Sequence, residues 1–185
     1  MKRIIFFDGD GTLWYPKTTK HTRKPHWIYH DPTTMNDPLS HLAVIPGVKR
    51  TLRELQRRGI LTVLISTHPH TKKDADQLLQ EKVRHFKLDS LFNEVHSSRL
   101  TPTGKGTVIK RVLKQRHIPK TRALMIGDSY IWDYRSAKDA GIDAVLIDTA
   151  YLRARPGTGK VKQRIKSFSE ILALPFLQDP LFFVR

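Results

Sequence analysis

Short apolar runs alternate along this chain with longer segments in which apolar residues recur at helical spacing. Such short runs are typical of buried strands, and their alternation with helical patterns is typical of β-α units around a parallel sheet. The strands are expected at 4–7, 61–65, about 93–95, 123–126 and 144–147. The helices are expected at about 47–58, 72–86, 105–116, 133–140 and 167–174.

Glycine and serine residues mark several of these boundaries. Gly59 and Gly141 fall where two helices should end, and Ser167 is placed to cap the start of the last one. The stretch 15–45 fits neither pattern and predicts a long ordered loop or a β-flap, because it is rich in proline and polar residues. The whole pattern predicts an α/β fold. We expect a Rossmann-like three-layer sandwich around a mostly parallel five-stranded sheet, in one domain over 1–185.

The composition is that of a globular protein, with 39% apolar and 27% charged residues among 185. The absence of cysteine excludes a disulfide scaffold, a thiol nucleophile, a zinc knuckle and an iron–sulfur cluster. No apolar run approaches the roughly 20 residues needed to cross a bilayer, and the first one is too short for a signal peptide. We therefore expect a soluble, cytoplasmic protein without a membrane partner.

Positive charge is unevenly distributed. The chain holds 33 Lys and Arg against 17 Asp and Glu, a net charge of +16. Residues 97–122 carry eight basic side chains and 150–168 carry six, with no acid in either stretch. If both stretches share a face, that face attracts polyanions such as nucleic acid. The alternative is that they are solvated helix faces.

Acidic side chains follow two of the predicted strands directly. Asp8 and Asp10 come after the first strand, and Asp128 comes after the strand at 123–126, with Asp133 five residues beyond. Ligands of open parallel sheets bind at the carboxyl ends of the strands, so these acids should meet there. Like charges gather only where a cation neutralises them, and oxygen ligands favour Mg²⁺.

Two further positions complete a site for phosphoryl transfer. Ser66, with Thr67 beside it, follows a third strand, and Lys105 lies near the expected start of a helix. A hydroxyl donor and a fixed cation suit the oxygens of a transferring phosphoryl group.

In order and setting, the segment Asp8-Gly-Asp-Gly-Thr12, then Ser66, Lys105 and Gly127-Asp128 with Asp133, resemble the four motifs of haloacid dehalogenase-like hydrolases. The resemblance spans residues 4–148. It implies a Mg²⁺-dependent phosphomonoester phosphatase that works through an aspartyl-phosphate.

The resemblance also implies a role for each matching residue. Asp8 would be the nucleophile and Asp10 the general acid and base, and the presence of Asp10 favours phosphatase over dehalogenase chemistry. The phosphate would be held by Ser66, Thr67 and Lys105. The Mg²⁺ would be bound by Asp8, the backbone carbonyl of Asp10 and Asp128, and Asp133 would support the metal or Lys105.

The gaps between the motifs leave little room for a cap domain, so we expect a capless enzyme, a monomer or a homodimer, with 15–45 over the active site. The segment Asp10–Trp14 looks most like the magnesium-dependent phosphatase branch of capless members. The fourth motif departs from that branch, which commonly has a second acid where this chain has Ser129. Capless heptose- and histidinol-phosphate phosphatases are another match, but their zinc-binding cysteines are absent here.

The substrate stays open between a phosphorylated small molecule and an exposed phosphate on a macromolecule. The alternatives are a nucleic-acid 3′-end phosphatase and a basic nucleic-acid-binding protein on the same fold. Four aromatic residues could stack bases or could pack the flap and core: Trp14, Trp27, Tyr29 and Trp132. His68 and His70 could line the substrate entrance, but we expect exposed loop histidines.

Overall fold

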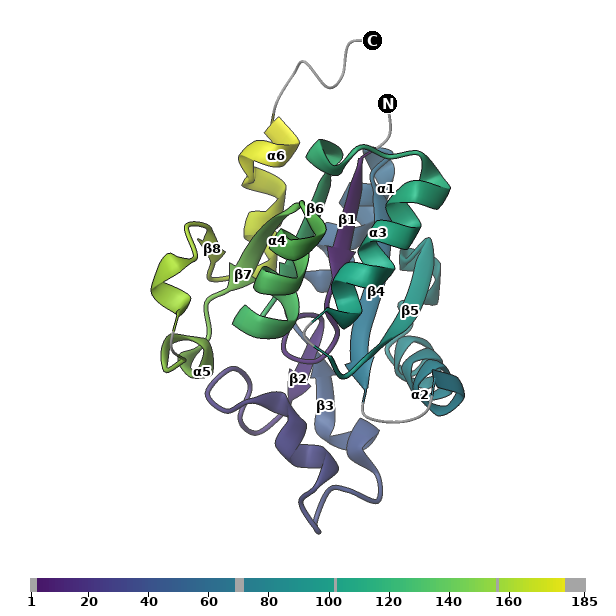
Figure 1. The fold of residues 1–185 in the computed structure, drawn as a ribbon. Coiled ribbons are helices and arrows are strands. Elements are labelled where there is room, and N and C mark those ends of the chain that lie inside the picture. The colour runs from purple at the N-terminus through teal and green to yellow at the C-terminus, as the bar shows by residue number, and fades with distance from the viewer. Residues whose placement is uncertain (1–2, 69–71, 102, 156, 179–185) are drawn as a thin grey trace.

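The computed structural model describes residues 3–68, 72–101, 103–155 and 157–178. Its main sheet has six strands in the order β5-β4-β1-β6-β7-β8, and every neighbouring pair is parallel (Figure 1). The strands are β1 (Ile4–Phe7), β4 (Leu61–His68), β5 (Glu94–Arg99), β6 (Ala123–Gly127), β7 (Asp143–Ile147) and β8 (Arg164–Ile165). The expected α/β fold around a parallel sheet is therefore confirmed.

The expected number of strands was wrong by one. The sixth strand, β8, is two residues long and pairs Ile147 with Ile165, so no apolar run marks it in the sequence. Strands β4 and β5 also extend beyond their expected ends, because polar residues continue the pairing, with Ser66 opposite Ser97 and Thr67 opposite Ser98.

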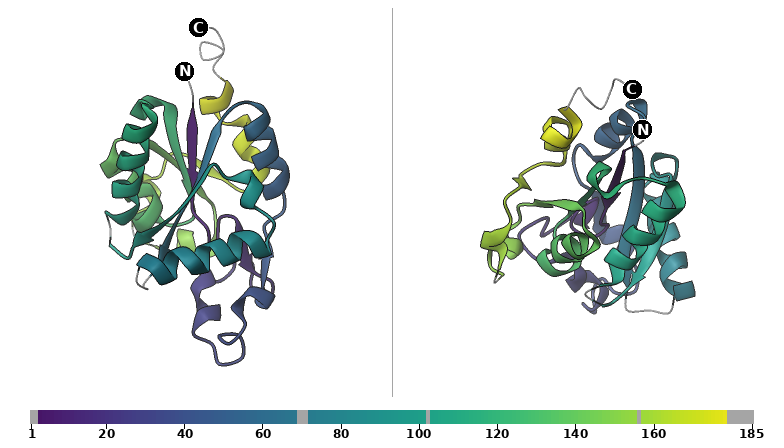
Figure 2. Two further views of the ribbon diagram at one scale, coloured as in Figure 1. Left: turned by 90° about the vertical axis from the view of Figure 1, so that its right-hand side faces the viewer. Right: turned by 45° about the horizontal axis from the view of Figure 1, so that its top comes forward.

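Two helical layers cover the sheet, as its strand residues require. Ile5 and Phe7 of β1 belong to one buried cluster, whereas Ile4 and Phe6 belong to a second cluster on the opposite face. The first cluster includes side chains of α1 (Val48–Arg57) and α2 (Lys72–His85), and the second those of α3 (Gly104–Arg116) and α4 (Ser136–Ala140). Figure 2 (left) shows the sheet between α1 on one side and α3 and α4 on the other.

The helix boundaries follow the expected signals, except that two expected helices differ in type and one further helix was not expected. Gly59 and Gly141 follow α1 and α4 with φ of 69° and 85°, the left-handed conformation that glycine adopts easily. The helix expected at 133–140 instead begins with a π-helical segment, Tyr130–Arg135, before α4. The one expected at 167–174 is a 3₁₀ helix, Phe168–Ala173, with Ser167 at its N-cap, followed by α6 (Pro175–Gln178). A short α5 (Ala150–Arg153) was not expected.

The flap (residues 15–45) contains strands and short helices. Its ends pair as an antiparallel hairpin of β2 (Trp14–Pro16) and β3 (Leu42–Val44). Between these strands lie two 3₁₀ segments, Pro25–Tyr29 and Pro38–His41. The flap lies beyond the carboxyl end of β1 (Figure 1).

The strand order places a binding site at this same end. The chain runs outward from β1 through β4 to β5 and then crosses back to β6, so β1 and β6 are neighbours at the point where the order reverses. Ligands of open α/β sheets bind in the crevice at such a point. The described chain between Thr12 and Ser66 forms only the flap, α1 and most of β4, without a separate cap domain.

The two basic stretches lie toward opposite edges of the sheet. The stretch 97–122 contains α3, which packs against β4 and β5, whereas 150–168 contains β8, the strand at the other edge. Among the described residues, no helix has the length and apolar character needed to cross a membrane.

Candidate active site

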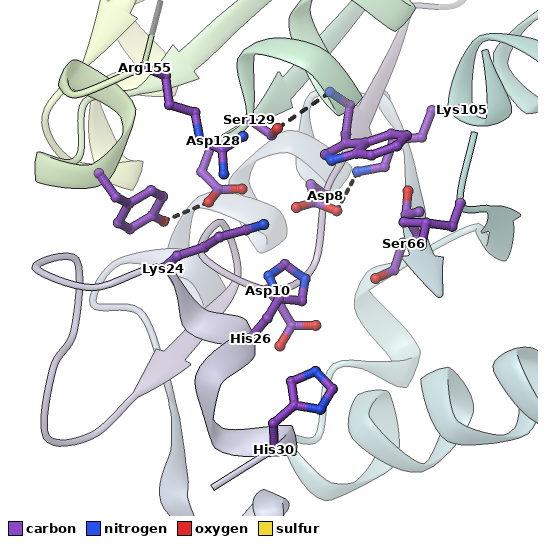
Figure 3. Close-up of a pocket in the computed structure, with 14 residues that line it drawn as sticks. Asp8, Asp10, Lys24, His26, His30, Ser66, Lys105, Asp128, Ser129 and Arg155 are labelled. Atoms are coloured by element: carbon purple, nitrogen blue, oxygen red, sulfur yellow. Dashed lines mark hydrogen bonds and ion pairs between the residues drawn. The ribbon is translucent and has the colours of Figure 1, made fainter. Parts of the chain in front are cut away.

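Three strand ends and one helix start deliver their side chains to one cavity of about 310 Å³. Asp8 follows β1, Ser66 lies in β4, Asp128 follows β6, and Lys105 is in the first turn of α3. The amide of Asp8 donates to the carbonyl of Ile126 at 2.9 Å, which extends the pairing of β1 with β6 by one residue. The sequence-predicted residues thus meet in one place (Figure 3).

Hydrogen bonds of Lys105 and Asp133 fix the positions of other acidic residues of this cavity. Lys105 is 3% exposed, and its ammonium donates hydrogen bonds to the carboxylates of Asp8 and of Asp133, the latter at 2.5 Å. The other Asp133 oxygen accepts from the backbone amides of Asp128 at 3.0 Å and Ser129 at 2.8 Å. Asp133 therefore fixes both the ammonium and the turn that carries Asp128.

Three buried carboxylates lie together here. One oxygen from each of Asp8, Asp128 and Asp133 lies within 4.8 Å of the other two. Burial, together with the charges of Asp8 and Asp133, raises the pKa of Asp128 well above its usual range. Tyr151 donates a hydrogen bond to Asp128 at 2.6 Å. The donor set is all oxygen and bears excess negative charge, so it fits a hard divalent cation.

Gly11 allows the first loop to approach this group closely. Its φ of 86° lies in the left-handed region, and a Cβ added there would lie 2.3 Å from Oδ2 of Asp128. A side chain at this position would therefore collide with the carboxylate.

The Asp10 side chain lies apart from the three carboxylates. It accepts hydrogen bonds from Lys82 at 2.9 Å and from the Tyr29 hydroxyl, and Lys82 also donates to Tyr29 at 2.7 Å. Burial alone would raise the pKa of Asp10, but the charges of Lys82 and His26 and these hydrogen bonds outweigh it and lower the pKa to about 2. Figure 3 shows the Asp10 carboxylate on the side of His26 and His30.

The two hydroxyls at the end of β4 differ in their surroundings. Ser66 is 2% exposed and lines the cavity. Thr67 also lines it, while its hydroxyl lies 2.9 Å from the hydroxyl of Ser98 on β5.

Sequence reasoning missed the residues that hold Asp10 and Asp128. Lys82 carried a signal, because it occupies the apolar face of α2 together with Leu79 and Val83, where a lysine needs a buried partner. Tyr151 carried none, since it lies in α5, a helix of four residues that no pattern in the sequence predicts.

The aromatic candidates mostly serve packing. Trp14 is fully buried and stacks on Phe86 with ring centroids 5.4 Å apart, and Trp27 donates to Thr19 within the flap. Only Trp132 lines the cavity with a partly exposed side chain.

The expectation of exposed histidines after β4 was wrong for His68. This residue is the last of β4, is buried, and lines an adjoining cavity of about 660 Å³. His70 lies outside the described residues.

A family model described as haloacid dehalogenase-like hydrolase matches residues 14–147, which include Ser66, Lys105, Asp128 and Asp133. The chain belongs to this family. Asp8 and Asp10 lie just before the matched segment, and the structure places Asp8 against Lys105.

Curated relatives carry phosphatase names. A glyceraldehyde 3-phosphate phosphatase of Pyrococcus furiosus is 28% identical over 130 residues, covering 65% of this chain and 49% of the relative. A phosphoglycolate phosphatase of Pseudomonas savastanoi pv. phaseolicola is 32% identical over 115 residues, covering 61% and 40%. The chain thus matches half or less of the length of these relatives.

Solved structures share the fold at low identity. An uncharacterized protein from Listeria monocytogenes serotype 4b superposes with a TM-score of 0.68 at 18% identity, covering 95% of this chain and 98% of that one. CbbY from Rhodobacter sphaeroides in complex with phosphate gives 0.63 at 18% identity, covering 97% and 100%.

Proposed function

We propose that this chain is a Mg²⁺-dependent phosphomonoester phosphatase that forms an aspartyl-phosphate on Asp8. One observation carries the proposal: Asp8 and Asp128, from two distant parts of the chain, lie in one buried carboxylate group. A lysine and a serine hydroxyl, Lys105 and Ser66, line the same cavity. The phosphatase names of the relatives support the same activity.

The cation would be held by Asp8 and Asp128, with the backbone carbonyl of Asp10. Asp133 already accepts three hydrogen bonds, so it would support the site by fixing Lys105 and the amide of Asp128. When bound, Mg²⁺ neutralises the carboxylates and polarises a phosphoryl oxygen.

The reaction would proceed in two steps. Ser66, Thr67 and Lys105 would bind the phosphoryl oxygens, and an Asp8 oxygen would attack phosphorus while the bond to the leaving oxygen breaks. That oxygen would take a proton from Asp10 in its acid form. In the second step water would attack the aspartyl-phosphate and give its proton to the Asp10 carboxylate, which releases phosphate and restores Asp8.

The contacts of Asp10 suit the second step. Lys82 and Tyr29 hold it as a carboxylate, which is the form that accepts a proton from water. The first step needs Asp10 protonated, or a leaving group that departs without a proton.

The test is turnover of para-nitrophenyl phosphate with Mg²⁺ by the Asp8→Asn variant. We expect kcat to fall about 1,000-fold or more, because the nucleophile is gone. Asp139→Asn, which neutralises an exposed acid on α4, should retain turnover, and thermal melting should show that both variants fold. Full activity of Asp8→Asn would refute the aspartyl-phosphate mechanism.

A further inference from the structure

Two cations from distant parts of the chain line the cavity of the candidate site. Lys24 belongs to the flap, and Arg155 follows α5. Figure 3 shows both near Asp128, with the Lys24 ammonium directed into the cavity toward Asp8. The motifs that define the family do not include either residue.

Neither side chain is paired with an acid among the residues that the structure describes. Asp148, which lies in the sequence near Arg155, is already shared by Arg153 at 3.0 Å and Arg164 at 3.7 Å. Other surface cations do have partners, such as Arg116 on Glu94. The pKa of Lys24 is lowered by burial and by the charge of Arg155, which outweigh the opposite effect of the Asp128 charge, so the two cations lie close enough to repel each other.

Neighbouring cations that form no ion pair with an acid are stabilised by an anion that binds between them. The transferred phosphoryl group cannot be this anion alone, since Ser66 and Lys105 already face it at the cavity floor. A second negative group on the same molecule would reach Lys24 and Arg155 while the first lies at Asp8.

We propose that Lys24 and Arg155 form a subsite for a second anionic group, a carboxylate or a second phosphate, on a small phosphomonoester substrate. This inference rests on the proposed function and names its substrate class. A cavity of about 310 Å³ holds a small molecule, and His26 and His30 of the flap also line it.

The experiment compares substrates that differ only in the second charge. One pair is 2-phosphoglycolate and 2-hydroxyethyl phosphate, and the other is propane-1,3-diol bisphosphate and 3-hydroxypropyl phosphate. We expect kcat/KM to be about 10-fold higher for the anionic member of at least one pair, the effect of hydrogen bonds to a charged group. The pair with the larger ratio distinguishes carboxylate from phosphate recognition.

Substitutions then assign that ratio to the subsite. Lys24→Gln and Arg155→Gln should each bring the ratio toward one, chiefly by raising KM for the anionic substrate. Lys162→Gln also removes one positive charge, at an exposed position in the basic stretch 150–168 that contains Arg155, and it should leave the ratio unchanged. A ratio that persists in both subsite variants overturns the proposal.

Binding to the Asp8→Asn variant separates the subsite from the activity. Calorimetry with Mg²⁺ measures the affinity for each pair without turnover, so the subsite is judged even if no phosphomonoester is hydrolysed. Equal affinities within both pairs overturn the subsite. If the unsubstituted protein hydrolyses none of these compounds but Asp8→Asn still binds an anionic member more tightly than its neutral counterpart, only the proposed phosphatase activity is overturned. A 3′-phosphorylated oligonucleotide that binds more tightly than every small compound overturns the small-substrate assignment.

Discussion

Lys82 places a buried ammonium between the flap and the loop that follows β1. It is 5% exposed, contacts Asp10 and Tyr29, and lies 4.5 Å from the centre of the Tyr29 ring. Removing one member of a buried ion pair leaves the other charge without compensation, which is far costlier than losing an exposed pair. Lys82 is therefore both a positioning residue for Asp10 and a contributor to stability.

The Lys82→Met variant should lower the free energy of unfolding by about 3–5 kcal/mol at neutral pH. Because the folded pKa of Asp10 is about 2 against an ordinary value of 3.8, the interaction stabilises above pH 3.8 and is lost as the pH falls toward 2. Urea denaturation measures the effect.

Arg84→Met is the matched control, since Arg84 is an exposed cation on the same helix and should change stability by only about 0.5 kcal/mol. The double variant with Asp10→Asn should lose less than the sum of the single losses. Equal losses for Lys82→Met and Arg84→Met would contradict the buried pair.

Gly127 is the last residue of β6 and faces the Asp133 carboxylate. A Cβ added to Gly127 would lie 2.2 Å from Oδ2 of Asp133, so Gly127→Ala must displace the group that holds Lys105. We expect a loss of about 1–3 kcal/mol in stability and a clear fall in kcat with para-nitrophenyl phosphate. Gly159→Ala has no atom within 4 Å of the new Cβ and should leave both values nearly unchanged. Full activity of the Gly127→Ala variant would show that the Asp133 carboxylate can do its work without a glycine at position 127.

At the scale of elements, Trp14 joins the flap to the helical layer. It lies in β2, is fully buried and stacks on Phe86 just after α2, so the hairpin is fixed by one large side chain. Lys82, which holds Asp10, projects from the same helix. The position of the flap over the site therefore depends on its packing against α2.

Trp14→Ala should cost about 3–5 kcal/mol of unfolding free energy, as expected for a large side chain removed from a core. It should also make the flap more sensitive to limited proteolysis. Trp27→Ala removes the same side chain from a partly exposed flap position and should cost less. Equal costs would mean that the flap is not fixed through Trp14.

The sequence predicts the strands that are buried on both faces, but it does not predict the short elements that are held by a few tertiary contacts. Strands such as β1 and β6 are apolar throughout because both of their faces are covered, so an apolar run is enough to find them. Strand β8 has only Arg164 and Ile165, so its pairing depends on tertiary contacts. The β-flap expected as one alternative for 15–45 is confirmed, but the ends of its hairpin, Trp14 and Val44, were not predicted.

The candidate site divides in the same way. Asp8, Asp128 and Lys105 stand at strand ends and a helix start, where local pattern gives the position. Tyr151 lies in the short helix α5 and Arg155 just after it, and no periodicity in the sequence marks either residue.

For the whole molecule, the net charge of +16 and the buried carboxylates have opposite consequences for metal binding. A strongly basic protein repels free cations, so Mg²⁺ should not stabilise it through surface acids. Asp8, Asp128 and Asp133 concentrate negative charge in one buried place, and burial with the two neighbouring charges raises the pKa of Asp128. A divalent ion bound to the folded state alone would relieve that repulsion.

Mg²⁺ should therefore raise the melting temperature of this protein, and a chelator should reverse the effect. At about 100 times its dissociation constant, the ion would add about 2.7 kcal/mol of stability. Asp128→Asn should remove most of this increase, while Asp139→Asn, at an exposed position, should keep it. Differential scanning calorimetry across a Mg²⁺ titration measures both. If Mg²⁺ raises the melting temperature of the Asp128→Asn variant by the same amount, the ion does not depend on Asp128 and binds elsewhere.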